Sequence, residues 1–156
     1  MKIPFLVPPR DSLNRIIRAT KGCPAACTFC DIHQTKFPCR SPESVVDEVE
    51  QLVKMGVDNL FFVDDTITIN KQNLIDTCNL MVERGLKLHY KISARVDTIN
   101  EEVVKTLKKS GCYRIHFGIE SASPRHSKYL QKGKPLRKWN APAKWSAKRG
   151  SDFSPT

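Results

Sequence analysis

A stretch that begins with glycine, runs through apolar residues and ends in polar ones recurs in the middle of this 156-residue chain. It occupies residues 56–65, 85–95 and 111–120, and its glycines are 29 and 26 residues apart. Runs of strand length at this spacing, with helices between them, are typical of βαβ units, whose strands lie parallel. The pattern therefore predicts an α/β fold with a parallel sheet.

Amphipathic helices fit between these stretches. Behind each of three capping residues, apolar side chains recur at helical spacing, and a glycine follows at the expected end. The caps are Ser41 (with Pro42 at the first helical position), Asn70 and Asn100. A further strand is expected around residues 15–20, ahead of the first helix. The chain thus contains about four βα units with parallel strands.

The overall composition fits a globular protein, with 40% hydrophobic and 27% charged residues. No apolar run approaches the roughly 20 residues of a membrane helix. The first ten residues hold one lysine and three prolines and do not resemble a secretory signal. We expect a cytoplasmic protein with no membrane contact.

The net charge of +10 belongs almost wholly to the end of the chain. Residues 1–120 hold 17 Lys and Arg against 15 Asp and Glu, whereas residues 121–156 hold nine against one. Charge placed in this way says little about the partner of the main domain. We expect residues 133–156 to be a basic, disordered tail. The alternative, a nucleic-acid contact through Trp139 and Trp145, is the less favoured interpretation.

Three of the six cysteines lie within eight residues, at Cys23, Cys27 and Cys30. In a reducing compartment such clustering favours a metal site over disulfides. Three thiolates leave one iron of a 4Fe-4S cluster open, and an open metal position is a reaction site. The residues alone leave two alternatives: a zinc site with Cys39 or His33 as fourth ligand, and a closed electron-transfer cluster with Cys39.

The Cys-x3-Cys-x2-Cys spacing, with Phe29 before the last cysteine, resembles the signature of the radical S-adenosylmethionine (SAM) superfamily. Residues 40–48, 62–65, 95–97 and 117–121 look like the core of the branch often paired with a cobalamin-binding domain. The resemblance covers roughly residues 8–131. It implies that the three cysteines bind a 4Fe-4S cluster whose unique iron binds SAM.

The resemblance also implies the chemistry. An external one-electron reductant, flavodoxin- or ferredoxin-like, reduces the cluster. The reduced cluster cleaves SAM to a 5′-deoxyadenosyl radical, which abstracts hydrogen from a substrate that the sequence does not name. The cofactor carries this chemistry, while the protein orients the reactants and excludes water.

Further cofactor contacts are implied at the loop and at the strand ends. These residues are Phe29, Asp64, Asp65, Arg95, Glu120 and Ser121. Asp64 and Asp65 stand where the superfamily often has Gly-Gly-Glu, which binds the methionine amino group. Arg95 could meet the SAM carboxylate, or it could form an ion pair with Asp97.

The superfamily core is a six-stranded partial barrel, and four strands are recognisable here. We therefore expect a partial TIM-like βα barrel, with a truncated core domain over residues 1–132. The missing strands normally close the adenine and substrate site, so truncation could leave the chain inactive. The alternative function is a non-catalytic iron–sulfur or zinc-binding module.

Overall fold

The computed structural model describes residues 14–118 together with residues 125 and 130. Strands and helices alternate along the chain, as the repeated pattern predicts. The elements are β1 (Asn14–Ile17), α1 (Pro42–Lys54), β2 (Asn59–Phe62), α2 (Lys71–Glu83), β3 (His89–Ala94), the 3₁₀ helix η1 (Val96–Thr98), α3 (Glu101–Lys109) and β4 (Cys112–Phe117).

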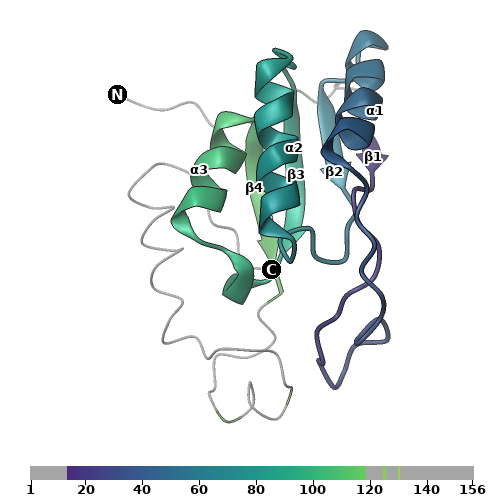
Figure 1. Cartoon of the computed structure of the whole chain (residues 1–156), viewed down its shortest axis with the longest axis vertical. Coiled ribbons are helices and arrows are strands. Elements are labelled where there is room, and N and C mark those ends of the chain that lie inside the picture. Colours follow the sequence, from purple (N-terminus) through teal and green to yellow (C-terminus); the bar gives the residue numbers. More distant parts are fainter. Residues whose placement is uncertain (1–13, 119–124, 126–129, 131–156) are drawn as a thin grey trace.

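The described strands form one parallel sheet in the order β1-β2-β3-β4. Figure 1 shows α1, α2 and α3 together on one face of this sheet. Sequential strand order with all helices on one face is the arrangement of a βα barrel, whereas a doubly wound sheet carries helices on both faces. The fold is thus α/β and part of a TIM-like barrel, which confirms the prediction.

The helices begin where the sequence predicts. At each start, a side-chain oxygen accepts a hydrogen bond from a backbone N–H that the helix leaves without a partner. These bonds join Ser41 to Ser44 at 3.2 Å, Asn70 to Asn73 at 3.1 Å and Asn100 to Val103 at 2.9 Å. At the far end of α3, Gly111 has φ +101°, and a Cβ there would overlap the carbonyl oxygen of Leu88. Only glycine fits this turn into β4.

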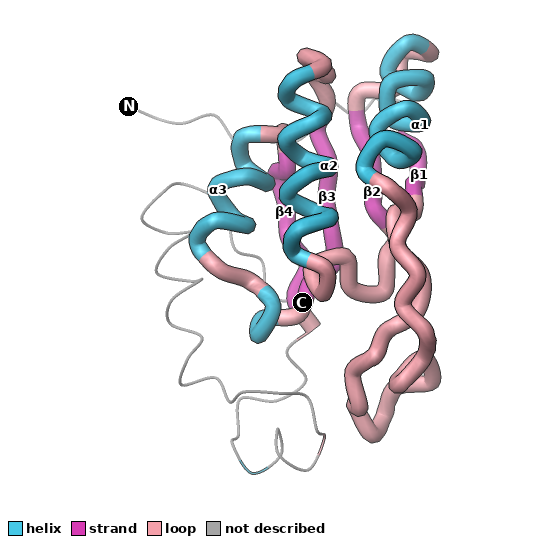
Figure 2. Tube along the Cα trace, in the orientation of Figure 1, coloured by secondary structure: helices cyan, strands magenta, loops and turns pink. Residues whose placement is uncertain are grey.

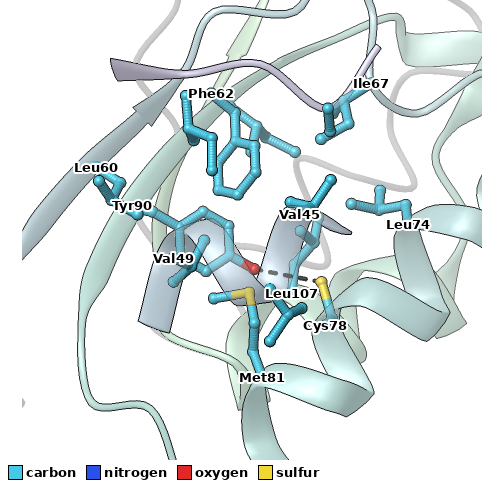
Figure 3. Packing of buried hydrophobic residues seen from close by; sticks show 14 of the residues in the cluster. Val45, Val49, Leu60, Phe62, Ile67, Leu74, Cys78, Met81, Tyr90 and Leu107 are labelled. Carbon is cyan, nitrogen blue, oxygen red and sulfur yellow. Dashed lines mark hydrogen bonds between the residues drawn. The ribbon is translucent and has the colours of Figure 1, made fainter. Parts of the chain in front are cut away.

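The hydrophobic core lies between the sheet and the three helices (Figure 3). Tyr90 of β3 is buried in its centre, and its hydroxyl lies 2.6 Å from Ser110 Oγ and 3.4 Å from Cys78 Sγ. Burial raises the pKa of both the Tyr90 phenol and the Cys78 thiol. Cys78 is therefore a core residue, as its place on the apolar face of α2 predicts.

The first strand is shorter than the expected residues 15–20, since β1 ends at Ile17. Beyond Ile17, the backbone N–H groups of Ala19 and Thr20 donate to the Asp64 side chain, so they do not continue the backbone hydrogen bonds between strands. The predicted domain boundary at residue 132 and the basic tail lie outside the described residues. Across residues 14–118, none of the helices combines the length and apolar character of a membrane span.

Candidate functional site

The three clustered cysteines lie in the loop that joins β1 to α1, which we call the cysteine loop (residues 21–38). Its two ends are tied together, because Lys21 N–H donates to Pro38 O at 3.2 Å and Arg40 N–H donates to Ala19 O at 2.9 Å. Figures 1 and 2 show the loop extending from the edge of the sheet where the β2–α2 connection and η1 also lie. This is the carboxyl edge of the parallel strands, where βα barrels carry their active sites.

Backbone hydrogen bonds fold the cysteine loop back on itself. Cys23 N–H donates to Thr35 Oγ1 at 2.8 Å, and Thr35 N–H donates to Cys23 O at 2.9 Å. Cys30 N–H donates to Cys27 O at 3.3 Å in a turn. All three cysteines are free thiols, with Cys23 and Cys27 buried and Cys30 half-buried. The loop thus holds three unpaired thiols on one short segment.

Gly22 has a conformation that this loop requires. Its φ is +78°, and a Cβ would overlap Lys36 O and lie 2.7 Å from Thr35 Oγ1. Its N–H also donates to Asp65 Oδ2 at 2.8 Å. Neither Gly22 nor Thr35 was identified as a site residue from the sequence. A glycine directly before the first cysteine is a signal that could have been used, but nothing in the sequence marks Thr35.

Asp64 and Asp65 follow β2 at the same edge but have different environments. Asp64 is buried, and its Oδ1 accepts hydrogen bonds from Ala19 N at 3.1 Å, from Thr20 N and from Thr20 Oγ1 at 2.6 Å. Burial raises the pKa of the Asp64 carboxyl, and the bonds from Thr20 and Ala19 oppose that rise. Asp64 therefore joins the end of β2 to the start of the cysteine loop. The Asp65 carboxylate is half-buried beside Gly22.

Arg95 directly follows β3 and reaches the cysteine loop. Its Nη1 donates to Cys27 Sγ at 3.2 Å, while its Nε and Nη2 bond to the two Asp97 oxygens at 3.0 and 2.8 Å. The ion pair with Asp97 predicted as one alternative is thus present. The Asp97 carboxylate raises the pKa of Arg95, so the guanidinium is cationic.

The alternative metal ligands lie at other places in the loop. Cys39 pairs with Thr20 at the base of the loop, and its Sγ lies 3.8 Å from both Phe37 O and Asn70 Nδ2. His33 Nδ1 contacts the carbonyl oxygen of Cys30. Among the residues that the structure describes, no three His, Cys, Asp or Glu side chains are grouped as one metal ion would require. Cluster ligands are arranged differently, because each cysteine binds a separate iron.

Of the remaining predicted contact residues, Phe29 is described by the structure, whereas Glu120 and Ser121 are not. Phe29 lies in the cysteine loop with 48% of its surface exposed. Glu120 and Ser121 lie just beyond β4 and outside the described residues. The structure therefore places Phe29 and the three cysteines in the loop that leaves the carboxyl edge of the sheet, the edge where Asp64, Asp65 and Arg95 also lie.

Comparison with known proteins places the chain in a family. The model of the radical SAM superfamily matches residues 17–152. An uncharacterized methyltransferase of Pyrococcus horikoshii is 38% identical over 123 residues, which cover 76% of this chain and 27% of that protein. The anaerobic magnesium-protoporphyrin IX monomethyl ester cyclase of Cereibacter sphaeroides is 38% identical over 112 residues, or 66% of this chain and 18% of the cyclase.

A solved structure supports the same fold. The radical SAM methyltransferase TsrM of Kitasatospora setae, with tryptophan and a SAM analogue bound, superimposes with a TM-score of 0.78 at 19% identity. The match covers 88% of this chain and 28% of TsrM. TsrM has also been solved with cobalamin and a [4Fe-4S] cluster bound. The chain thus spans about a quarter or less of the length of the curated relatives named above.

Proposed function

Because this chain belongs to the radical SAM superfamily, we propose that Cys23, Cys27 and Cys30 hold a 4Fe-4S cluster whose fourth iron binds SAM. The observation that carries the proposal is the cysteine loop, which presents three free thiols at the carboxyl edge of a partial barrel. When bound and reduced, the cluster would supply the electron that cleaves a C–S bond of SAM to give methionine and a hydrogen-abstracting 5′-deoxyadenosyl radical. An external flavodoxin- or ferredoxin-like protein is the proposed reductant.

The thiols suit an iron–sulfur cluster in number and setting. Thiolates are the usual ligands of such clusters, and three of them leave one iron for an external ligand. Cys23 and Cys27 are 9% and 6% exposed, so the fold shields these two of the three cysteines from water. Shielding of this kind and hydrogen bonds to sulfur both set the potential of a cluster. The chain's own contribution is to hold these ligands and limit solvent access.

We assign the contact with the SAM ammonium group to Asp65 and not to Asp64. The Asp64 carboxylate is buried and already accepts hydrogen bonds from Ala19 and Thr20. Asp65 is half-buried and is held at the cysteine loop by Gly22 N–H. Its carboxylate keeps acceptor capacity for a cationic group. Phe29, whose ring is exposed, is proposed to contact the adenine.

Glu120 and Ser121 stay proposed cofactor contacts on the strength of the family pattern. The relatives named above include methyltransferases and a ring-closing cyclase, and each is longer than this chain. We therefore propose radical chemistry initiated by SAM for the whole protein. The reaction that follows hydrogen abstraction is proposed to lie within the range of methyl transfer and cyclisation.

Anaerobic reconstitution with iron and sulfide tests the ligand set. The 156-residue chain should take up about four irons and four sulfides and, after reduction by dithionite, give the EPR signal of a 4Fe-4S cluster. Single Cys→Ala replacement at 23, 27 or 30 should abolish this uptake. Cys39→Ala is the matched control, since Cys39 lies near the same loop, and it should bind iron as the wild type does.

The opposite result would favour the non-catalytic alternative. If Cys39→Ala or His33→Ala strips the metal, the site is closed by a fourth protein ligand and has no open iron. If the purified chain binds one zinc ion per molecule and no iron, the cluster assignment is wrong.

A further inference from the structure

The contact between Arg95 and Cys27 joins parts of the chain that are 68 residues apart. Cys27 lies in the middle of the cysteine loop, whereas Arg95 follows the last residue of β3. The distance from Nη1 to Sγ is 3.2 Å, which is short for a hydrogen bond to sulfur. The Arg95 side chain is only 14% exposed, so water screens this cation poorly.

Two further contacts fix the direction of the Arg95 guanidinium. Asp97 forms a bidentate ion pair with Nε and Nη2 of Arg95, which fixes the plane of the guanidinium group. The Arg95 carbonyl accepts hydrogen bonds from Thr98 N at 3.2 Å and Thr98 Oγ1 at 2.7 Å, which closes the η1 turn. With the backbone and one edge held, Nη1 faces Cys27. The arrangement is therefore a preorganised donor aimed at a thiol.

We propose that Arg95 is a positioning residue that donates a charge-assisted hydrogen bond to the Cys27 thiolate and raises the reduction potential of the cluster. This inference rests on the proposed function, because it requires the cluster to be present. Reduction adds one negative charge to the cluster and its thiolates. A cation and donor beside one sulfur stabilises the reduced form more than the oxidised form.

This role differs from a contact with the SAM carboxylate, which the family pattern implies for Arg95. A carboxylate contact exists only when SAM is bound and affects the affinity for SAM. The bond to Cys27 is formed by the protein alone, so it acts on the cluster before SAM arrives. The potential of the SAM-free cluster therefore separates the two roles.

The experiment is redox potentiometry of the reconstituted full chain without SAM, followed by EPR of the reduced cluster. In Arg95→Gln the midpoint potential should become more negative. At a fixed potential, the ratio of reduced to oxidised cluster should fall about tenfold, which is about 59 mV for one electron. Arg95→Lys keeps the charge but loses the planar fork, so its shift should have the same sign and be smaller.

Arg84→Gln is the matched control for removing a paired guanidinium. Arg84 is also held by carboxylates, with Asp47 at 2.6 Å and Glu50 at 2.9 Å, but these lie on α1 and not in the cysteine loop. The midpoint potential of the cluster in Arg84→Gln should equal that of the wild type. An Arg95→Gln chain with full iron content, an unchanged potential and weakened SAM binding would overturn the inference in favour of the carboxylate role.

A second measurement does not depend on how well Arg95→Gln assembles a cluster. Wild-type chain labelled with ¹⁵N-arginine should show a weak nitrogen coupling to the reduced cluster in pulsed EPR, and Arg95→Lys should lack it. Absence of this coupling in a wild-type sample with a complete cluster would refute the contact. A wild-type chain that forms no cluster would overturn the proposed function, and this inference with it.

Discussion

Replacement of Asp64 by alanine should strongly destabilise the fold, although Asp64 lies in a family motif associated with cofactor binding. Its carboxylate is 3% exposed, and its Oδ1 accepts hydrogen bonds from two backbone N–H groups and one hydroxyl. Alanine would leave Ala19 N–H and Thr20 N–H buried without an acceptor. Each orphaned buried donor costs about 1–3 kcal/mol.

Summed over these two donors, Asp64→Ala should lower the free energy of unfolding by about 2–6 kcal/mol. That is a large share of the roughly 5–15 kcal/mol by which native proteins are stable. The assay is urea unfolding followed by far-UV circular dichroism. The slope of the unfolding free energy against urea concentration should be unchanged, because the same surface becomes exposed on unfolding.

Asp64→Asn is the matched control. An asparagine Oδ1 can keep the three bonds that Asp64 Oδ1 now accepts, so this variant should lose no more than about 1 kcal/mol. It also removes a titrating group. Because burial raises the pKa of Asp64, the native state binds its proton more tightly than the unfolded state does. The stability linked to Asp64 is therefore greatest at low pH and is lost as pH rises through the raised pKa.

The stability of Asp64→Asn relative to the wild type should accordingly increase as the pH rises above the ordinary pKa of aspartate and through the raised pKa of Asp64. We assign to the Asp64 carboxylate the role of joining the end of β2 to the start of the cysteine loop. An Asp64→Ala chain whose free energy of unfolding lies within about 0.5 kcal/mol of the wild type would refute that role. So would equal losses in the Ala and Asn variants, because only one of them lacks the acceptor.

Other substitutions test the loop and the core by the same unfolding assay, combined with iron content after reconstitution. Gly22→Ala should lower the free energy of unfolding by more than the roughly 1–2 kcal/mol of a left-handed residue, and it should reduce iron uptake. Gly85 has φ +64° and nothing within 4 Å of an added Cβ, so Gly85→Ala should lose only about that amount and keep its iron uptake. Equal effects at both glycines would contradict the close packing at Gly22. Thr35→Val removes the acceptor for the first cysteine's N–H and should cost about 1–3 kcal/mol, and an unchanged stability would show that water replaces that bond. Tyr90→Phe should lose about 1–2 kcal/mol through the bond to Ser110, with iron uptake unchanged, and a loss of iron would contradict its assignment to the core alone.

Features that depend on neighbouring residues could be predicted from the sequence. The helix starts at Ser41, Asn70 and Asn100 were predicted correctly, because a cap and its partner are three residues apart. The repeat of strand and helix likewise predicted the parallel sheet, since parallel neighbours need a crossover. The cysteine triplet is local as well, which is why its family could be identified before the fold was known.

The roles of single side chains were harder to predict, because their partners are distant in sequence. Asp64 bonds to residues 44 and 45 positions earlier, and nothing in its neighbouring residues indicates that it is buried. The contact of Arg95 with Cys27 joins residues 68 positions apart, so it depends on where the cysteine loop lies relative to the end of β3, which only the packed structure defines. Gly22 is an intermediate case. A glycine before the first cysteine suggests an unusual backbone conformation, but the atoms that a Cβ would overlap there are known only from the structure.

Formation of 5′-deoxyadenosine tests the central claim most directly. The chain should be reconstituted anaerobically, reduced with dithionite and incubated with SAM. The products should then be separated by liquid chromatography and identified by mass spectrometry. We predict 5′-deoxyadenosine from the wild type and none from a chain with alanine at Cys23, Cys27 and Cys30. A wild-type chain that carries about four irons yet neither binds nor cleaves SAM would contradict the account and leave a cluster-binding module.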